Sequence, residues 1–85
     1  MTNLDLIKSF NRGAKKGHSG GRDIDTKKYN LRIEGDNLVN YSTIIAKRGL
    51  NGAIVLNNKK YSQTTSIIQN KIRQYCNVVE EVEGF

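Results

Sequence analysis

The spacing of apolar residues along this chain changes from a period of two to a helical period, which restricts the fold to a sheet followed by a helix. Apolar and polar residues alternate over residues 29–34, as in a half-buried strand. A second run rich in β-formers covers residues 38–47, and residues 53–56 form a third. Residues 60–62 predict a brief further strand. The pattern therefore predicts three or four antiparallel strands joined as a meander.

Turn residues separate these runs in the way that a meander requires. Residues 34–37 read Glu-Gly-Asp-Asn, and residues 49–52 contain an Asn-Gly pair between two apolar runs. An Asn-Gly pair in that setting is a strong hairpin signal, because both residues tolerate a positive φ. Consecutive strands are therefore expected to pair with their neighbours along the chain.

A helix is predicted after the meander, where Ser66 and Gln69 fit a capping box. Apolar side chains then recur at helical spacing and form one stripe, made of Ile68, Ile72, Tyr75, Cys76 and Val79. This stripe is expected to lie across one face of the sheet. A short helix is also predicted over residues 3–12, with Thr2 as its cap and Gly13 as its stop.

These elements divide the chain into four segments. The N-terminal helix takes residues 1–12, and residues 80–85 form an acidic tail. Residues 13–28 form a flexible basic loop, because the Gly- and Lys-rich first part of it lacks any large apolar side chain to offset the entropy of ordering. Residues 29–79 form the core. The predicted fold class is α+β, a three- or four-stranded antiparallel meander with a C-terminal helix packed on one face and a short N-terminal helix.

Composition predicts a cytoplasmic protein that does not enter a membrane. The apolar runs are far too short to span a bilayer, and the N-terminus lacks the features of a signal peptide. The single cysteine, Cys76, has no partner for an internal disulfide. If the basic loop is flexible, about 55 residues build the core, and cores of that size are marginal alone. A homo-oligomer is therefore expected.

The net charge of +6 is unevenly distributed. Residues 1–77 hold all 14 Lys and Arg residues against five acids, a balance of +9, and the remaining residues hold three glutamates. A basic body attracts phosphate-bearing partners such as nucleic acids and nucleotides, or an acidic protein surface. The alternative is ordinary surface charge that aids solubility.

The sequence contains no convincing catalytic motif, so we expect neither an enzyme nor a bound metal or cofactor. Residues 17–21 formally match G-x-S-x-G, but no strand precedes them, and the sole histidine, His18, is adjacent to the serine. One histidine and one cysteine do not supply a zinc site without carboxylates. The Gly-Lys-hydroxyl triplet of a P-loop does not occur. A loose loop with Lys15, Lys16 and Arg22 can still wrap a phosphate, and a solvated linker is the alternative.

The segment most informative about binding is hydroxyl-rich and extends over residues 59–66. It combines two lysines with several hydroxyls where a strand is followed by a helix N-terminus, whose free amides favour anions. With cations of the neighbouring hairpin and one further tyrosine, the candidate ligand contacts are Lys59, Lys60, Tyr61, Ser62, Thr64, Thr65, Ser66, Lys47, Arg48 and Tyr41. The alternative is that one hydroxyl caps the helix and the others face water.

Tyrosines interleaved with cations can stack nucleic-acid bases. By alternation, Tyr29 shares a face with the apolar residues of its strand and belongs to the core, and Tyr75 lies on the helix stripe. Tyr41 and Tyr61 are therefore the two tyrosines expected to contact a ligand.

Residues 40–46 read NYSTIIA, and residues 60–70 read KYSQTTSIIQN. Together they resemble small bacteriophage and prophage proteins of uncharacterised function that share a YST-x-IA block followed by KYS-x-TTS-x-x-QN. The match covers roughly residues 30–75. The resemblance implies a non-enzymatic protein that counters host immunity, either by sequestering a nucleotide signal or by blocking a CRISPR effector. DNA-mimicking inhibitors are usually acidic, so the basic body disfavours that route.

The sequence thus predicts a phage-type binding protein that captures a phosphate-bearing ligand, either a nucleotide signal or nucleic acid. Two alternatives stay open. One is a protein–protein inhibitor of a host defence protein, such as a CRISPR effector nuclease. The other is a plain DNA- or RNA-binding module that uses the basic loop and the sheet face.

Overall fold

The computed structural model describes residues 2–18 and 31–85 of the chain. Within these residues the chain forms two helices and six strands. In chain order they are α1 (Asn3–Asn11), β1 (Lys16–His18), β2 (Leu31–Glu34), β3 (Asn37–Asn40), β4 (Thr43–Arg48), β5 (Ile54–Asn57), α2 (Gln63–Tyr75) and β6 (Val78–Val82). No helix in this part of the chain is long and apolar enough to cross a membrane.

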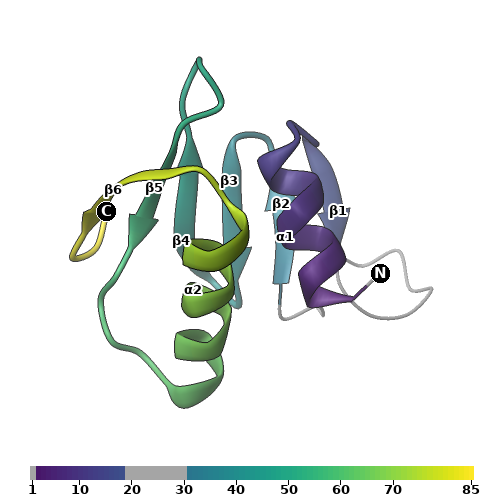
Figure 1. Ribbon diagram of the computed structural model, residues 1–85. Helices are drawn as coiled ribbons and strands as arrows, with labels where there is room; N and C mark the ends of the chain where they lie inside the picture. The colour runs from purple at the N-terminus through teal and green to yellow at the C-terminus, as the bar shows by residue number, and fades with distance from the viewer. Residues whose placement is uncertain (1, 19–30) are drawn as a thin grey trace.

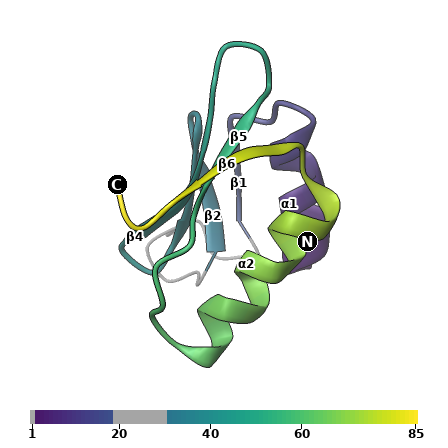
Figure 2. The same ribbon diagram turned by 60° about the vertical axis from the view of Figure 1, so that its left-hand side comes forward.

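One sheet contains all of these strands, and their order in the sheet follows their order in the chain. Neighbouring strands are antiparallel except β5 and β6, which are parallel because α2 carries the chain back between them. Both helices pack on the same face of the sheet, α1 against β2 and α2 against β5 (Figure 1, Figure 2). The predicted α+β class, with both helices, is confirmed, and the sheet has more strands than predicted.

The apolar faces of both helices meet the inner face of the sheet in one core. The buried cluster consists of Leu6, Ile7 and Phe10 from α1, Ile68 and Ile72 from α2, and Leu31, Ile33, Leu38, Ile45, Ala46, Ile54 and Leu56 from the sheet. Cys76 packs against this core as predicted, whereas Tyr75 and Val79 of the predicted stripe are exposed. Because α2 ends at Tyr75, the helical spacing no longer applies to Val79, which lies in β6.

The single strand predicted over residues 38–47 is wrong, because these residues belong to two strands, β3 and β4. A turn at Tyr41 and Ser42 separates them, and Asn40 pairs with Thr43 across it. Tyr41 has a positive φ of 56°, a conformation that glycine and asparagine adopt more readily than tyrosine. Tyrosine is more typical of strands than of such a turn, so the β-rich composition concealed the turn.

The loop predicted over residues 13–28 contains strand β1, which pairs with β2 at one edge of the sheet. This strand passes close to α1, since a Cβ on Gly17 would lie 2.8 Å from Leu6 Cδ1. The glycine therefore allows close packing here. Residues 19–28 of the predicted loop, and Tyr29 of the predicted strand, lie outside the described residues.

The prediction of an acidic tail over residues 80–85 is wrong for its first part, because residues 80–82 belong to strand β6. Glu80 and Glu81 lie in this strand, which pairs in parallel with β5. The Glu81 carboxylate accepts a hydrogen bond from Arg73 of α2 at 2.9 Å, and this contact lowers the pKa of Glu81. The pairing depends on a strand distant in the chain, so local composition does not reveal it.

A buried guanidinium joins α1 to the sheet. Arg48, at the end of β4, is 7% exposed. Its Nη1 donates to the carbonyl of Phe10, and its Nη2 donates to the carbonyls of Ala14 at 3.0 Å and Gly35 at 2.9 Å. Nε and Nη2 also donate to the Asp36 carboxylate. The side chain thus links the end of α1, the segment that follows it and the β2–β3 turn.

We expect Arg48→Met to lower the free energy of unfolding by about 2–4 kcal/mol, because it keeps much of the side-chain volume but leaves buried carbonyls without a donor. Urea denaturation followed by circular dichroism measures the change. Lys47→Met, on the exposed neighbour, is the control and should change stability by less than about 0.5 kcal/mol. An unchanged stability of Arg48→Met would contradict the role of the guanidinium.

The carboxylate of Asp36 makes the stability depend on pH. Hydrogen bonds from Lys15 and then from Arg48 hold the pKa of Asp36 below its ordinary value of 3.8. Because folding favours the charged form, the stabilising contribution is complete above about pH 5 and is lost as the pH falls through the lowered pKa.

We expect Asp36→Asn to weaken the dependence of the urea midpoint on pH below about 5. Glu80→Gln, which removes an acid outside this cluster, should keep the wild-type dependence.

Candidate functional site

Helix α2 begins earlier than predicted, and its N-cap is Ser62. The Ser62 Oγ accepts a hydrogen bond from the Thr65 backbone amide at 3.2 Å. Ser66 lies inside the helix, and residues 60–62 do not form the predicted strand. The predicted capping box of Ser66 and Gln69 is therefore wrong, because the helix begins one turn earlier and the Ser62 hydroxyl accepts from the Thr65 amide in its first turn.

Thr65 is a structural residue rather than an accessible ligand contact. It is 4% exposed, and its Oγ1 accepts hydrogen bonds from Asn40 Nδ2 at 2.9 Å and from the Ser62 hydroxyl at 3.1 Å. Asn40 is itself 2% exposed at the end of β3, so the bond ties the sheet to the first turn of α2. The hydroxyls of Ser62 and Thr65 are thus engaged within the fold.

Two buried amides, Asn57 and Gln69, shape the segment between β5 and α2. Gln69 Nε2 donates to the carbonyls of Asn57 at 2.7 Å and Lys59 at 3.0 Å. Asn57 Nδ2 donates to the Ile44 carbonyl at 3.1 Å and to the Tyr61 hydroxyl at 2.9 Å. Sequence reasoning missed both residues, because asparagine after a strand indicates a turn and the glutamine fitted a cap. No local signal shows that they are buried.

Six of the predicted contacts are exposed around the start of α2: Tyr41, Lys59, Lys60, Tyr61, Thr64 and the N-cap Ser62, whose hydroxyl is already engaged. The Lys59 Nζ lies 5.8 Å from the centroid of the Tyr61 ring. Neither Lys59 nor Lys60 forms an ion pair with any other residue that the structure describes. Both positive charges are therefore available to an anion.

Lys47 and Arg48 do not join this surface. Arg48 is buried among the groups that it binds, so it is not available to a ligand and its prediction as a contact is wrong. Lys47 alternates with the buried Ala46 and Arg48, so its side chain lies on the face of the sheet away from the two helices. Its Nζ is 4.8 Å from the centroid of the Phe85 ring. Ser66, half-buried in the body of α2, does not add a free hydroxyl at the helix end.

The two helix N-termini differ in charge. Helix α1 carries Asp5 in its first turn, where hydrogen bonds from Thr2 lower the pKa of Asp5. Helix α2 has no acidic residue in its first turn. The amides of Gln63 and Thr64 have no hydrogen-bond partner among the described residues. The first turn of α2 therefore does not neutralise the positive end of this helix with a charge of its own.

A hollow of about 610 Å³ over the β1–β2 hairpin is the alternative binding surface. Its lining includes Lys15, Lys16 and Arg32, and two of these three are paired within the fold, Lys15 with Asp36 and Arg32 with Glu34 at 2.9 Å. The start of α2 therefore offers an anion more uncompensated charge than this hollow does.

The cysteine is poorly suited to nucleophilic chemistry. Its Sγ lies 3.7 Å from the carbonyl oxygen of Ile7, and burial raises the pKa of the Cys76 thiol to about 11. A thiol with that pKa is protonated at neutral pH. Within residues 2–18 and 31–85, no three His, Cys, Asp or Glu side chains form a group that could hold a metal ion.

Comparison with protein-family models, with curated proteins and with solved structures finds no match for this chain. The resemblance to phage proteins over residues 30–75 therefore stays a prediction. The function has to be argued from the site itself.

We expect Thr65→Val to lower the free energy of unfolding by about 1–2 kcal/mol, because valine keeps the shape but removes the oxygen that accepts from Asn40 and Ser62. Thr64→Val makes the same chemical change at an exposed position and should alter stability by less than about 0.5 kcal/mol. Urea denaturation of both variants measures the difference. Equal losses in the two would show that Thr65 does not have this structural role.

Proposed function

We propose that this chain is a non-enzymatic binding protein that captures a phosphate-bearing ligand, a nucleotide signal or nucleic acid, at the start of α2. The observation that carries the proposal is the uncompensated positive end of this helix. Its first turn has no acidic residue, and Lys59 and Lys60 come just before it in the chain. A helix end with free amides and nearby cations is a preferred position for phosphate oxygens.

The exposed groups at the start of α2 contribute to binding in two ways, by hydrogen bonding and by long-range attraction. The amides of Gln63 and Thr64 and the Thr64 hydroxyl donate to phosphate oxygens, and the two lysines attract the anion over a longer range. An exposed helix end contributes about 0.3–1 kcal/mol per charge, which does not hold a ligand tightly by itself. The lysines and the neighbouring tyrosine rings therefore supply much of the affinity.

The resemblance to phage proteins gives this binding a biological setting. A phage protein that sequesters a nucleotide signal would keep it from a host defence pathway in the bacterial cytoplasm. The proposed role is therefore to counter host immunity by ligand capture.

Docking on a protein, such as a host defence nuclease, is the second candidate function. The β4–β5 hairpin projects beyond the rest of the sheet and carries Leu50, whose side chain is fully exposed (Figure 1, Figure 2). The same residue is available for self-association into a homo-oligomer. Single exposed leucines are common on monomeric proteins, so this candidate ranks below ligand capture.

Gln63→Glu tests the proposal, because it should change stability and binding in opposite directions. A carboxylate in the first turn interacts favourably with the helix end, so we expect the free energy of unfolding to rise by about 0.3–1 kcal/mol. The same carboxylate repels phosphate, so the affinity for a labelled nucleoside triphosphate and a labelled oligonucleotide should fall about tenfold. Thermal denaturation and fluorescence anisotropy measure the two effects.

Gln74→Glu makes the same change of charge near the other end of α2 and is the matched control. It should leave both affinities within about twofold of wild type, because solvent and salt screen the more distant charge. Equal weakening by the two variants would mean that net charge alone attracts the probes, and the proposed site would be wrong.

A further inference from the structure

Tyr41 occupies a backbone position that disfavours its side chain. It is the one non-glycine residue with a positive φ, 56°, in the part of the chain that the structure describes. Its side chain is 56% exposed, and its hydroxyl forms no hydrogen bond with another described residue. Packing therefore does not explain a tyrosine at this position. Non-glycine residues in this backbone region cluster at functional sites, so Tyr41 is a candidate for a functional role.

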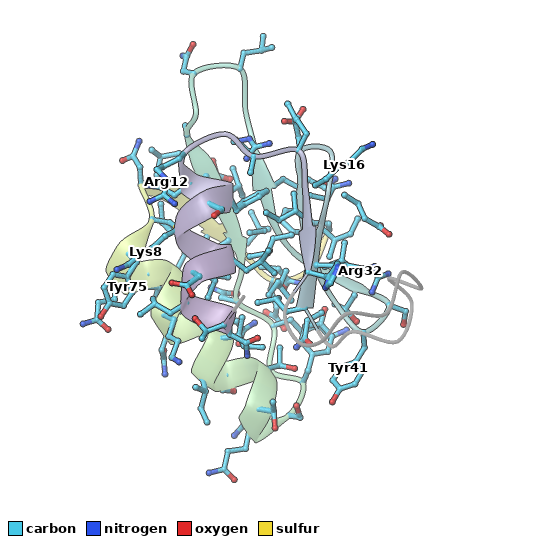
Figure 3. The ribbon with its side chains drawn as sticks, turned by 90° about the vertical axis from the view of Figure 1, so that its right-hand side faces the viewer. Lys8, Arg12, Lys16, Arg32, Tyr41 and Tyr75 are labelled. Atoms are coloured by element: carbon cyan, nitrogen blue, oxygen red, sulfur yellow. The ribbon has the colours of Figure 1, made fainter. Side chains whose placement is uncertain are left out.

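The turn that carries Tyr41 is held on both sides. Arg32 Nη1 donates to the carbonyl of Tyr41, and Arg32 Nε donates to the Glu34 carboxylate at 2.9 Å. The preceding residue, Asn40, donates to Thr65 in the first turn of α2. Figure 3 shows Tyr41 at the edge of the molecule beyond Arg32, on the side away from α1. The ring is thus an exposed group on a fixed backbone.

Tyr61 provides a second exposed ring near the same helix start. It is 41% exposed, its hydroxyl is held by Asn57, and the Lys59 Nζ lies over its ring. The Asn57 side chain also donates to the carbonyl of Ile44, which lies on the strand that follows Tyr41. Hydrogen bonds therefore link the segment that carries Tyr61 to β4, which follows the Tyr41 turn, and link Asn40, which precedes Tyr41, to the first turn of α2.

We propose that the ligand is single-stranded nucleic acid, whose unpaired bases stack on Tyr41 and Tyr61 while its phosphates contact the start of α2. This inference rests on the proposed function and names its ligand class. Stacking on two separate rings requires at least two bases on one backbone, which a mononucleotide lacks. A duplex covers the faces of its interior bases. Because every base has a stacking face, binding should depend little on base sequence.

Tyr41→Asn distinguishes this role from a structural one. Asparagine tolerates a positive φ, so the melting temperature should rise, whereas loss of the ring should weaken binding of a labelled oligonucleotide of about 12 nucleotides roughly tenfold. Tyr41→Phe keeps the ring and should bind within about twofold of wild type. Tyr75→Asn removes an exposed tyrosine at the far end of α2 and is the control, with an affinity close to that of wild type.

Fluorescence anisotropy with the wild-type protein compares this oligonucleotide, the same sequence as a duplex, and a nucleoside triphosphate. Tighter binding of the single strand, weakened in Tyr41→Asn and kept in Tyr41→Phe, supports the inference. Equal affinity for the strand and the triphosphate, or unchanged affinity in Tyr41→Asn, overturns it. If Gln63→Glu still weakens both probes in that case, the proposed function stands and the ligand class is wrong. If Gln63→Glu changes neither, the proposed function itself fails.

Discussion

The hydrogen bonds of the buried Arg48 side chain are the interactions on which the arrangement of the N-terminal half depends. One guanidinium satisfies the carbonyls of Phe10, Ala14 and Gly35 and also meets the Asp36 carboxylate. These groups end α1, lead into β1 and form the β2–β3 turn. The guanidinium makes five hydrogen bonds here from a planar group with five donors, whereas a lysine ammonium has only three donors. Helix α1 and the segment leading into the edge strand β1 are thereby fixed to β4 and to the β2–β3 turn.

A second set of buried polar groups decides which residues near α2 are available to a ligand. Asn57 and Gln69 hold the segment before the helix, and Asn40 holds its first turn through Thr65. The sequence identifies residues 59–66 as a polar segment at a helix start. It does not distinguish the buried hydroxyl of Thr65 from exposed ones, because that difference depends on a strand more than 20 residues away.

Two positions near this helix start carry residues that do not maximise stability. Tyr41 has a φ at which asparagine or glycine is less strained, and the first turn of α2 lacks the acid that α1 has in Asp5. Each local cost, of the order of 1 kcal/mol, lies at the surface where ligand binding is proposed. Folded proteins tolerate such costs where a site needs a specific ring or an open positive end. This coincidence is what favours a binding role for the region.

The sequence by itself determined the elements that depend on local chemistry. Helical spacing and the Thr2 cap predicted α1, the Asn-Gly pair predicted the β4–β5 hairpin, and apolar alternation over residues 29–34 predicted strand β2. Only the tertiary structure decided the rest. Strand β1 exists because Gly17 can pass against α1, β6 pairs with a strand before α2, and Arg48 became an interior group instead of a ligand contact. Each of these outcomes depends on partners distant in the chain, whose positions no local pattern encodes.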